Sequence, residues 1–297
     1  MSDRNADSTG RVAAGTLFVV ATPIGNLQDL SPRAAACLRD ADLLLAEDTR
    51  HTRRLLDACG IVRRGALESL HEHNERQRVP ALLARLEQGD SLAVVTDAGT
   101  PLLSDPGAAL VSAAVRAGHA VVAVPGPCAA IAALSIAGLP TERFAFEGFL
   151  PAKTGARRDV LGRLVDEPRT LVFYEAPHRL VETLRDLAET FGEEREAAVA
   201  RELTKRFETT YRGTLAELAR RSTSDVDMTR GELVVLIAGA PAPSEEAVAQ
   251  ASREAERVLR ALLAELPVSQ AARLAAELTG RSRSELYTRA LEIKESG

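Results

Sequence analysis

Short runs of branched apolar residues alternate, along the first half of the chain, with segments whose apolar residues recur at helical spacing. This alternation predicts a parallel sheet, and ligands on such sheets bind beyond the carboxyl ends of the strands. We therefore expect the loops at one sheet edge to surround a ligand cleft, with backbone groups supplying much of the recognition. Three apolar runs end abruptly in loops of glycine and proline: 17–20 before ATPIGN at 21–26, 92–95 before DAGTP at 97–101, and 121–124 before PGPC at 125–128.

The pattern predicts an N-terminal α/β domain over 16–140. Ser31 followed by Pro32 is typical of a helix start, because the hydroxyl caps the helix and proline suits its first position. Strands are expected at 16–21, 42–47, 67–71, 91–96 and 120–124, and helices at 32–40, 50–59, 75–88, 106–117 and 127–138.

The pattern changes over 141–240, which predicts a second α/β domain of the α+β kind. The break between its third and fourth strands is very short, which favours an antiparallel hairpin and therefore a mixed or antiparallel sheet. Its strands are expected at 143–148, 169–174, 196–203, 206–212 and 232–238, and its helices at 157–166 and 177–190.

A linker of alanine, glycine and proline at 239–244 precedes a small helical domain over 245–297. The segments 269–278 and 282–291 predict a helix-turn-helix. Arginines on its second helix could contact RNA, but glutamates on the same hairpin reduce its positive charge. RNA contact and simple packing therefore both stay open. At the other end, the polar segment 1–15 lacks the apolar core of a signal peptide and is expected to be a disordered leader.

Composition narrows the class of protein. A length of 297 residues suits about two domains, and the formal net charge of −5 argues against a protein that coats nucleic acid nonspecifically. Aromatic residues make up 3% of the chain and Trp is absent, which leaves little for base stacking. Three cysteines without a CxxC motif predict neither disulfides nor zinc and fit the cytoplasm. No membrane span is expected, because Pro125 and Pro127 interrupt the one long uncharged stretch.

Candidate chemistry follows the second and third strands of the first domain. Asp48 and Arg50 come directly after a strand, where catalytic groups usually lie. A functional role is favoured for both, over a role for Asp48 as the cap of the next helix. His71 and His73 share one strand face at a spacing that could bind a metal. No third ligand is evident nearby, so a polar substrate contact is favoured for His73 and no metal site is predicted.

Charged loops also end strands of the second domain. Lys153 follows the first of them, Glu175 ends the second, and Arg201 and Lys205 bring cations together at a strand turn, where they could clamp phosphate. The sequence has no GxGxxG after the first strand and no GxxxxGK[ST], so neither a Rossmann dinucleotide site nor a P-loop is supported.

Taken together, these motifs resemble one family, the ribosomal RNA small subunit methyltransferases I, which are 2′-O-ribose cytidine methyltransferases of the tetrapyrrole methylase superfamily. The resemblance runs in consistent order from about Gly15 to the C-terminus. Its motifs are ATPIGNL at 21–27, AEDTRHT at 46–52, HEHNE at 71–75, DAGTPLLSDPG at 97–107, PGPCAAIAALSIAGLP at 125–140, EGFLPAK at 147–153, FYEAPHRL at 173–180 and RELTKRFE at 201–208.

The resemblance implies a tetrapyrrole-methylase-like two-domain fold, S-adenosylmethionine as cofactor between the domains, and a homodimer. It also implies 16S rRNA of the small ribosomal subunit as substrate, with a cytidine of the decoding centre methylated on its ribose 2′-oxygen. The cofactor cleft would be lined by Pro23, Ala98, Gly99, Thr100, Leu103, Cys128 and Ala129 from the first domain and by Glu175 and Leu203 from the second.

Methyl transfer from a sulfonium is an in-line displacement, and a ribose hydroxyl is a poor nucleophile until it loses or shares its proton. The candidate proton acceptors are Asp48, His73 and Glu175, which the sequence does not rank. The candidates for positioning RNA phosphates are Lys153, Arg201 and Lys205.

Two alternatives stay open at this point. A relative acting on a tetrapyrrole or another small acceptor would use the same cofactor loops but need a broad apolar acceptor cleft, whereas the loops here carry charge. A non-catalytic RNA-binding factor for ribosome assembly would depend on the terminal hairpin and could dispense with the cofactor. The sequence also leaves open whether free rRNA, a precursor particle or the assembled subunit is methylated, and in which order cofactor and RNA bind.

Overall fold

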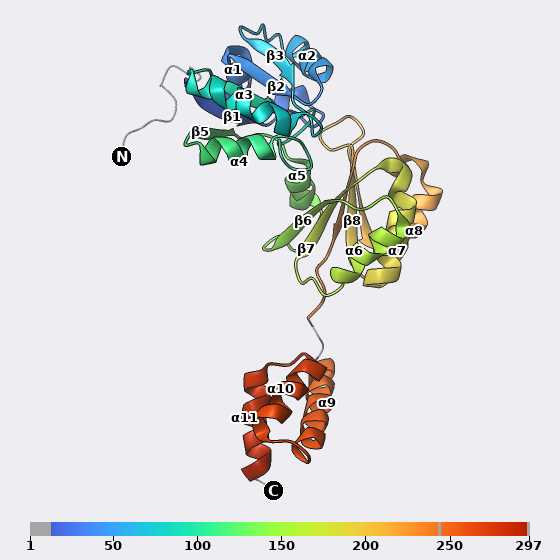
Figure 1. The fold of residues 1–297 in the computed structure, drawn as a ribbon. Helices are drawn as coiled ribbons and strands as arrows, with labels where there is room; N and C mark the ends of the chain where they lie inside the picture. The colour runs from blue at the N-terminus through green and yellow to red at the C-terminus, as the bar shows by residue number, and fades with distance from the viewer. Residues whose placement is uncertain (1–12, 243–244, 296–297) are drawn as a thin grey trace. The chain divides into compact units, whose positions relative to one another are not determined.

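The computed structural model describes residues 13–242 and 245–295, so residues 1–12 of the expected leader lie outside the described residues (Figure 1). Contacts divide the chain into two compact units, one ending at Ala240 and the other beginning at Pro241. The first unit contains two sheets of five strands each.

The first sheet is parallel throughout, as predicted, with the strand order β3-β2-β4-β1-β5. Strands β2 and β4 are buried along their whole length, which explains why they read as continuous apolar runs. The strands are β1 (Thr16–Val20), β2 (Leu43–Ala46), β3 (Ala66–Ser69), β4 (Leu92–Val95) and β5 (Ala120–Val124).

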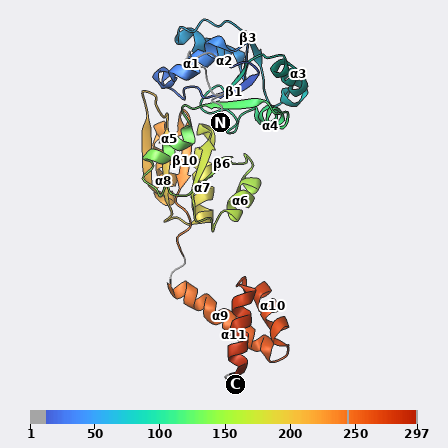
Figure 2. The ribbon, with the colours of Figure 1, turned by 90° about the vertical axis from the view of Figure 1, so that its left-hand side faces the viewer.

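Helices cover both faces of this sheet. Figure 2 shows α1 and α2 on one side and α3 and α4 on the other, and each pair closes its own apolar core. The start of α1 follows the prediction, since the Ser31 hydroxyl accepts a hydrogen bond from the Ala34 N–H and Pro32 takes the first helical position. The elements are η1 (Leu27–Asp29), α1 (Pro32–Asp40), α2 (Thr49–Ala58), α3 (Glu75–Glu87) and α4 (Ala108–Arg116).

The second sheet is mixed, with the order β6-β7-β10-β8-β9. Only β6 and β7 run parallel, and β8 and β9 form the predicted antiparallel hairpin. Because β10 runs opposite to β7 and β8, its first residue lies at the same edge as their last residues: Leu233 pairs with both Glu175 and Arg201. The strands are β6 (Phe144–Phe149), β7 (Thr170–Glu175), β8 (Glu196–Arg201), β9 (Thr209–Thr214) and β10 (Leu233–Ile237).

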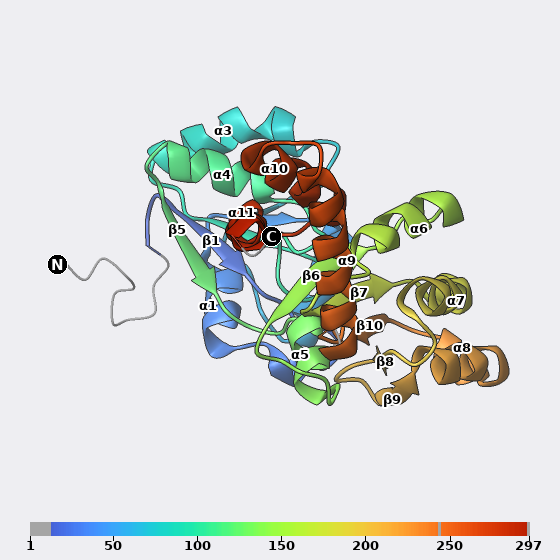
Figure 3. The same cartoon turned by 90° about the horizontal axis from the view of Figure 1, so that it is seen from below.

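Helices α6, α7 and α8 cover one face of the second sheet, and α5 covers the other (Figure 3). Although α5 falls in the range expected for the N-terminal domain, its residues Ala130, Ala133 and Leu134 pack against the second sheet. Helix α8 was not predicted. The elements are α5 (Ala129–Ile136), α6 (Thr154–Arg163), η2 (Pro177–Arg179), α7 (Leu180–Phe191), α8 (Leu215–Ser224) and η3 (Val226–Thr229).

The second unit holds three helices, α9 (Glu245–Leu263), α10 (Val268–Thr279) and α11 (Arg283–Glu295), in agreement with the predicted helix-turn-helix. Arg289, one of the arginines considered for RNA contact, pairs with Glu256 of α9 and Glu292 of its own helix. Arg281 donates to the Ser252 hydroxyl of α9. Both side chains thus help to pack this unit. Across the described residues, none of the helices is long and apolar enough to cross a membrane.

Candidate active site

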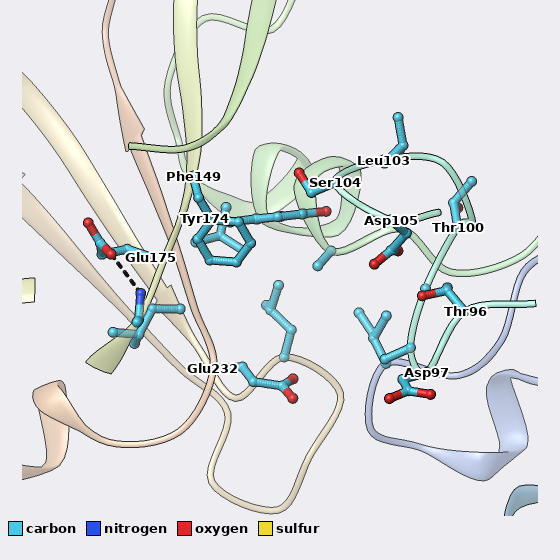
Figure 4. A pocket seen from close by; sticks show the side chains of 18 of the residues that line it. Thr96, Asp97, Thr100, Leu103, Ser104, Asp105, Phe149, Tyr174, Glu175 and Glu232 are labelled. Atoms are coloured by element: carbon cyan, nitrogen blue, oxygen red, sulfur yellow. Dashed lines mark hydrogen bonds between the residues drawn. The ribbon is translucent and has the colours of Figure 1, made fainter. Parts of the chain in front are cut away.

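A cavity of about 400 Å³ opens where the carboxyl edge of the parallel sheet meets the corresponding edge of the mixed sheet (Figure 4). The first sheet contributes the residues that follow β2 and β4, and the second contributes the ends of β6 and β7 and the start of β10. On one side the cavity is lined by Ile24, Glu47, residues 96–100 and 103–105, and Ala129. On the other side it is lined by Phe149, residues 174–177, Leu203 and residues 231–234.

The three glycine-rich loops meet beside this cavity, as the sequence predicted. Thr22 and Gly99 exchange two backbone hydrogen bonds, of 2.8 and 3.1 Å, which join the loops after β1 and β4. The Thr100 hydroxyl donates to the Pro127 carbonyl at 3.0 Å and joins the loop after β5. Gly99 has φ +86°, a conformation in which a side chain would be strained. These hydrogen bonds therefore fix the shape of the loops on the first-sheet side of the cavity.

Carboxylates dominate the first-sheet side of the cavity, which we call the acidic wall: Glu47, Asp97 and Asp105. Burial raises the pKa of Glu47, and the charges of Asp105 and Asp97 add to the shift. Burial likewise raises the pKa of Asp105. A cation bound beside Glu47 would offset the rise in its pKa, so the wall suits a positively charged ligand.

The neighbouring residues of α2 support Asp97. The His51 Nδ1 lies 2.8 Å from Asp97 Oδ2, and the Asp48 backbone N–H donates to Asp97 Oδ1 at 3.2 Å. Asp48 itself accepts a hydrogen bond from the Arg50 N–H and thereby caps α2. Hydrogen bonds from Arg50 hold the pKa of the Asp48 carboxyl well below its usual range. Asp48 is therefore a weak proton acceptor, and it is not among the residues that line the cavity.

The two aromatic rings of the lining, Phe149 and Tyr174, lie on the second-sheet side, which we call the aromatic wall. Glu232 also lines this side and pairs with Lys205. The Tyr174 ring makes edge contacts with Phe146 at 4.8 Å and with Phe149 at 5.6 Å between centroids. Burial raises the pKa of Tyr174 to about 12. In Figure 4 the labelled rings lie on one side of the cavity, opposite Asp97 and Asp105.

The loop after β8 closes the cavity against the first sheet. The Thr204 hydroxyl accepts from the Asn26 N–H at 3.1 Å, and Lys205 pairs with Glu202 at 2.9 Å and Glu232 at 3.1 Å. A Cβ on Gly25 would come within 2.4 Å of Lys205 Cγ, so only glycine allows this approach. Backbone at positive φ in Thr204 (64°) and Glu202 (51°) marks the loop as strained, a frequent property of ligand sites.

Most residues expected at the cofactor line this cavity. Pro23 and Cys128 do not, but each is next to a residue that does, Ile24 or Ala129, and Cys128 interacts with Tyr174. The expected cofactor residues that do line the cavity are Ala98, Gly99, Thr100, Leu103, Ala129, Glu175 and Leu203.

Of the remaining expected proton acceptors, only Glu175 reaches the cavity. Its carboxylate accepts from the Ala176 N–H and the Thr183 hydroxyl and lies 3.3 Å from Arg179, and Figure 4 shows it turned away from Asp97 and Asp105. It therefore anchors the segment that follows β7. His73 is exposed and outside the lining, in edge contact with the His71 ring at 5.9 Å.

The three cations expected to hold phosphate lie in different surroundings. Arg201 is 8% exposed and donates to the backbone carbonyls of Arg230 and Phe207 at 2.9 Å, so it braces the loop. Lys205 is half-buried in its two ion pairs, and Lys153 is exposed at the start of α6. In the described part of the chain, no group of three or more His, Cys, Asp or Glu could hold a metal ion.

Sequence reasoning missed several lining residues. Glu47 and Asp97 each lie at the first or second position after a strand, the same signal that singled out Asp48. Asp105 lies deeper in its loop. Phe149 and Tyr174 lie in motifs at the ends of expected strands, but neither ring was singled out as a candidate site residue. Only the folded arrangement brings these five side chains around one cavity.

Comparison with known proteins agrees with this arrangement. The family model of the tetrapyrrole (corrin/porphyrin) methylases matches residues 16–219, and that of the RsmI C-terminal HTH domain matches residues 249–294. The ribosomal RNA small subunit methyltransferase I of Pseudomonas aeruginosa is 56% identical, covering 95% of this chain and 98% of the relative. The chain belongs to the ribosomal RNA small subunit methyltransferase I family. It is thus a methyltransferase, as predicted.

Further members of the methyltransferase I family and more distant structures extend the comparison. The relative from Escherichia coli O157:H7 is 49% identical, covering 94% of this chain and 95% of its own. The uroporphyrin-III C-methyl transferase of Thermus thermophilus, complexed with S-adenyl homocysteine, aligns with a TM-score of 0.52 at 19% identity, covering 74% of this chain and 96% of that one. This last likeness confirms the predicted tetrapyrrole-methylase fold.

Proposed function

We propose that the protein transfers a methyl group from S-adenosylmethionine to the ribose 2′-oxygen of a cytidine in the decoding centre of 16S rRNA. Its membership of the small subunit methyltransferase I family supports the RNA substrate. The observation that carries the proposal is the cavity between the two sheets, whose acidic wall lies opposite an aromatic wall. One wall suits a cationic cofactor and the other suits an organic acceptor.

The residues present fit S-adenosylmethionine, which supplies, when bound, a methyl group on a positively charged sulfur. Glu47 is a half-buried carboxylate whose raised pKa falls back when a cation lies near it. Gly99 and Thr100 offer backbone held rigid by hydrogen bonds to neighbouring loops. Leu203 and Ala129 add apolar surface. The adjacent Pro23 and Cys128 stay in the proposed site as supports of these residues.

We rank Asp105 ahead of Asp48, His73 and Glu175 as the group that accepts the proton of the ribose hydroxyl. Asp105 lines the cavity, and its raised pKa makes it a stronger base than an ordinary aspartate. Asp48 has a lowered pKa, and both oxygens of Glu175 already accept hydrogen bonds. In this scheme the proton passes from the ribose hydroxyl to an Asp105 oxygen as the methyl group is transferred.

For the RNA phosphates, exposed Lys153 and half-buried Lys205 are the proposed contacts, whereas Arg201 supports Lys205 by bracing their common loop. The proposed partner is the small ribosomal subunit, the proposed assembly is a homodimer, and the proposed location is the cytoplasm. Arg50, Arg179 and Lys205 belong to ion pairs, and Arg201 donates to backbone carbonyls. A preformed RNA shape is therefore expected to supply much of the recognition.

The direct test is methyl transfer from labelled S-adenosylmethionine to small ribosomal subunits from cells that lack the activity, with the product nucleotide mapped by mass spectrometry. A ribose-methylated cytidine in the decoding centre is the expected product. Cofactor binding without an RNA product would favour a small acceptor instead. An absence of cofactor binding would favour a non-catalytic assembly factor.

A further inference from the structure

Phe149 is an unusual residue in this chain. It is 55% exposed although it lines the cavity, in a protein without tryptophan and with only 3% aromatic residues. A phenyl ring at the mouth of a cavity offers a flat apolar face that water solvates poorly. The composition argued against base stacking in general, but it does not argue against one ring at one chosen point.

A β-bulge directs this ring to the cavity. Phe146 and Phe149 are three residues apart, so in a regular strand they would point to opposite faces of the sheet. Both nevertheless contact the Tyr174 ring, because the register of β6 against β7 shifts between Phe146 and Gly148. Gly148 has φ +66°, which allows the extra residue. Bulges beside active sites commonly re-aim a side chain in this way.

The neighbours of Phe149 hold it in place. Its edge contact with Tyr174 has an interplanar angle of 61°, and Tyr174 is itself held by Phe146 and by the backbone of Ala130. A ring supported from one side and open on the other can stack with little loss of side-chain entropy on binding. The structure therefore supplies a preformed surface the size of one aromatic ring.

We propose that Phe149 stacks on the pyrimidine ring of the acceptor nucleotide and so orients its ribose toward the acidic wall. This rests on the proposed function, in which the acceptor is an RNA cytidine. Stacking on an aromatic side chain is the usual way in which proteins hold unpaired RNA bases. With the base on the aromatic wall, the ribose of the same nucleotide faces Asp105 across the cavity, which is the arrangement that the methyl transfer requires.

The test compares Phe149→Leu, which keeps apolar volume but removes the ring, with Phe149→Tyr, which keeps the ring. Phe207→Leu is the matched control, since Phe207 is 62% exposed on the same unit but does not line the cavity. Stacking predicts that Phe149→Leu lowers kcat/KM for small ribosomal subunits about 5- to 100-fold. Phe149→Tyr and Phe207→Leu are expected to stay within about threefold of the wild type.

Two measurements separate base stacking from other uses of the ring. The Kd of S-adenosylmethionine, by calorimetry, is expected to be unchanged in Phe149→Leu, and an equal loss there would mean that the ring stacks on the cofactor's adenine. Light scattering is expected to give the same mass for both proteins, and a change would mean that Phe149 is a subunit contact. Either result overturns the proposal.

A binding experiment distinguishes failure of this inference from failure of the proposed function. Saturation-transfer NMR of the cofactor-loaded protein is measured with cytidine 5′-monophosphate and with ribose 5-phosphate. The wild type is expected to bind the nucleotide more tightly, and Phe149→Leu to lose that preference. If small subunits are methylated but the variant keeps the preference, stacking is wrong and the function stands. If no RNA is methylated, the function itself fails.

Discussion

The two walls of the cavity come from sheets of different kinds and carry different chemistry. The acidic wall of Glu47, Asp97 and Asp105 lies on loops that follow parallel strands. There Asp97 accepts a hydrogen bond from the Asp48 N–H, and Glu47 accepts one from the Thr96 hydroxyl. The aromatic wall lies on the strands themselves, where Phe149 and Tyr174 are the last or next-to-last residues of β6 and β7.

The difference shows how one site obtains both polarity and shape. Loops can bring several carboxylates together despite their repulsion, because backbone bonds such as those between Thr22 and Gly99 hold the loops closed. Rings on neighbouring strands are instead positioned by the sheet register and by the bulge before Gly148. In this account, polar chemistry belongs to the first sheet and recognition of the acceptor belongs to the second.

Replacing the proposed base tests the acidic wall and carries the largest expected effect. Asp105→Asn keeps the shape of the side chain but removes its basicity, so we expect single-turnover methylation at saturating cofactor and RNA to fall at least about 100-fold. In the wild type the rate should fall at acidic pH as Asp105 becomes protonated. This fall should be absent in Asp105→Asn. Asp159→Asn, at an exposed position of α6, serves as the control. An unchanged single-turnover rate in Asp105→Asn would remove it from the mechanism.

Disturbing the bulge tests the aromatic wall, with a smaller expected effect. In Gly148→Ala the new methyl group would lie 3.1 Å from Ser104 Oγ and the residue would keep an unfavourable φ of +66°. We expect β6 to relax and Phe149 to turn away, which lowers kcat/KM for RNA about tenfold while the Kd of S-adenosylmethionine changes little. Gly155→Ala, which meets no atom within 4 Å, should leave both values unchanged. An RNA kcat/KM equal to that of Gly155→Ala would contradict the role of the bulge.

The smallest expected effect is on stability. The pKa of Glu47 is raised in the folded protein, so its ionised form costs stability once the pH exceeds that pKa, and the cost is absent below the unfolded value. Glu47→Gln should therefore raise the Tm of the cofactor-free protein at pH 7, by no more than about 2 °C because the carboxylate is partly solvated. At about pH 4 the gain should vanish. Exposed Glu72→Gln is the control. A lower Tm for Glu47→Gln at pH 7 would show that ionised Glu47 does not destabilise the folded protein.

Much of the fold could be predicted because the parallel strands are buried on both faces and end in glycine loops. The strands and helices of the first sheet differ from their predicted ranges by only one or two residues at most ends. Helix α8 was missed, although Thr214 and Glu217 form a capping box that the sequence displays as T-x-x-E. The packing of α5 on the second sheet could not be read from the chain, because its apolar residues suit either sheet equally.

The site was predictable where the backbone decides and not where tertiary contacts decide. The loop that carries Gly99 and Thr100 was expected at a cleft because glycine loops after parallel strands mark one, and the family resemblance pointed to these two residues. Arg201 was expected to face phosphate, whereas the structure turns its guanidinium to two backbone carbonyls. Phe149 lies in a quoted motif, but the direction of its ring could not be predicted, because a bulge depends on the pairing partner and is not visible in one strand alone.

The most direct test of the account is a crystal structure of the protein with S-adenosylhomocysteine and cytidine 5′-monophosphate. The account predicts the cofactor's sulfur in the cavity between the two walls, the cytosine ring stacked on Phe149, and the ribose 2′-hydroxyl within hydrogen-bonding distance of Asp105. A cofactor bound outside the cavity, or a cytosine ring away from Phe149 with its ribose remote from Asp105, would contradict the division of the site into an acidic and an aromatic wall.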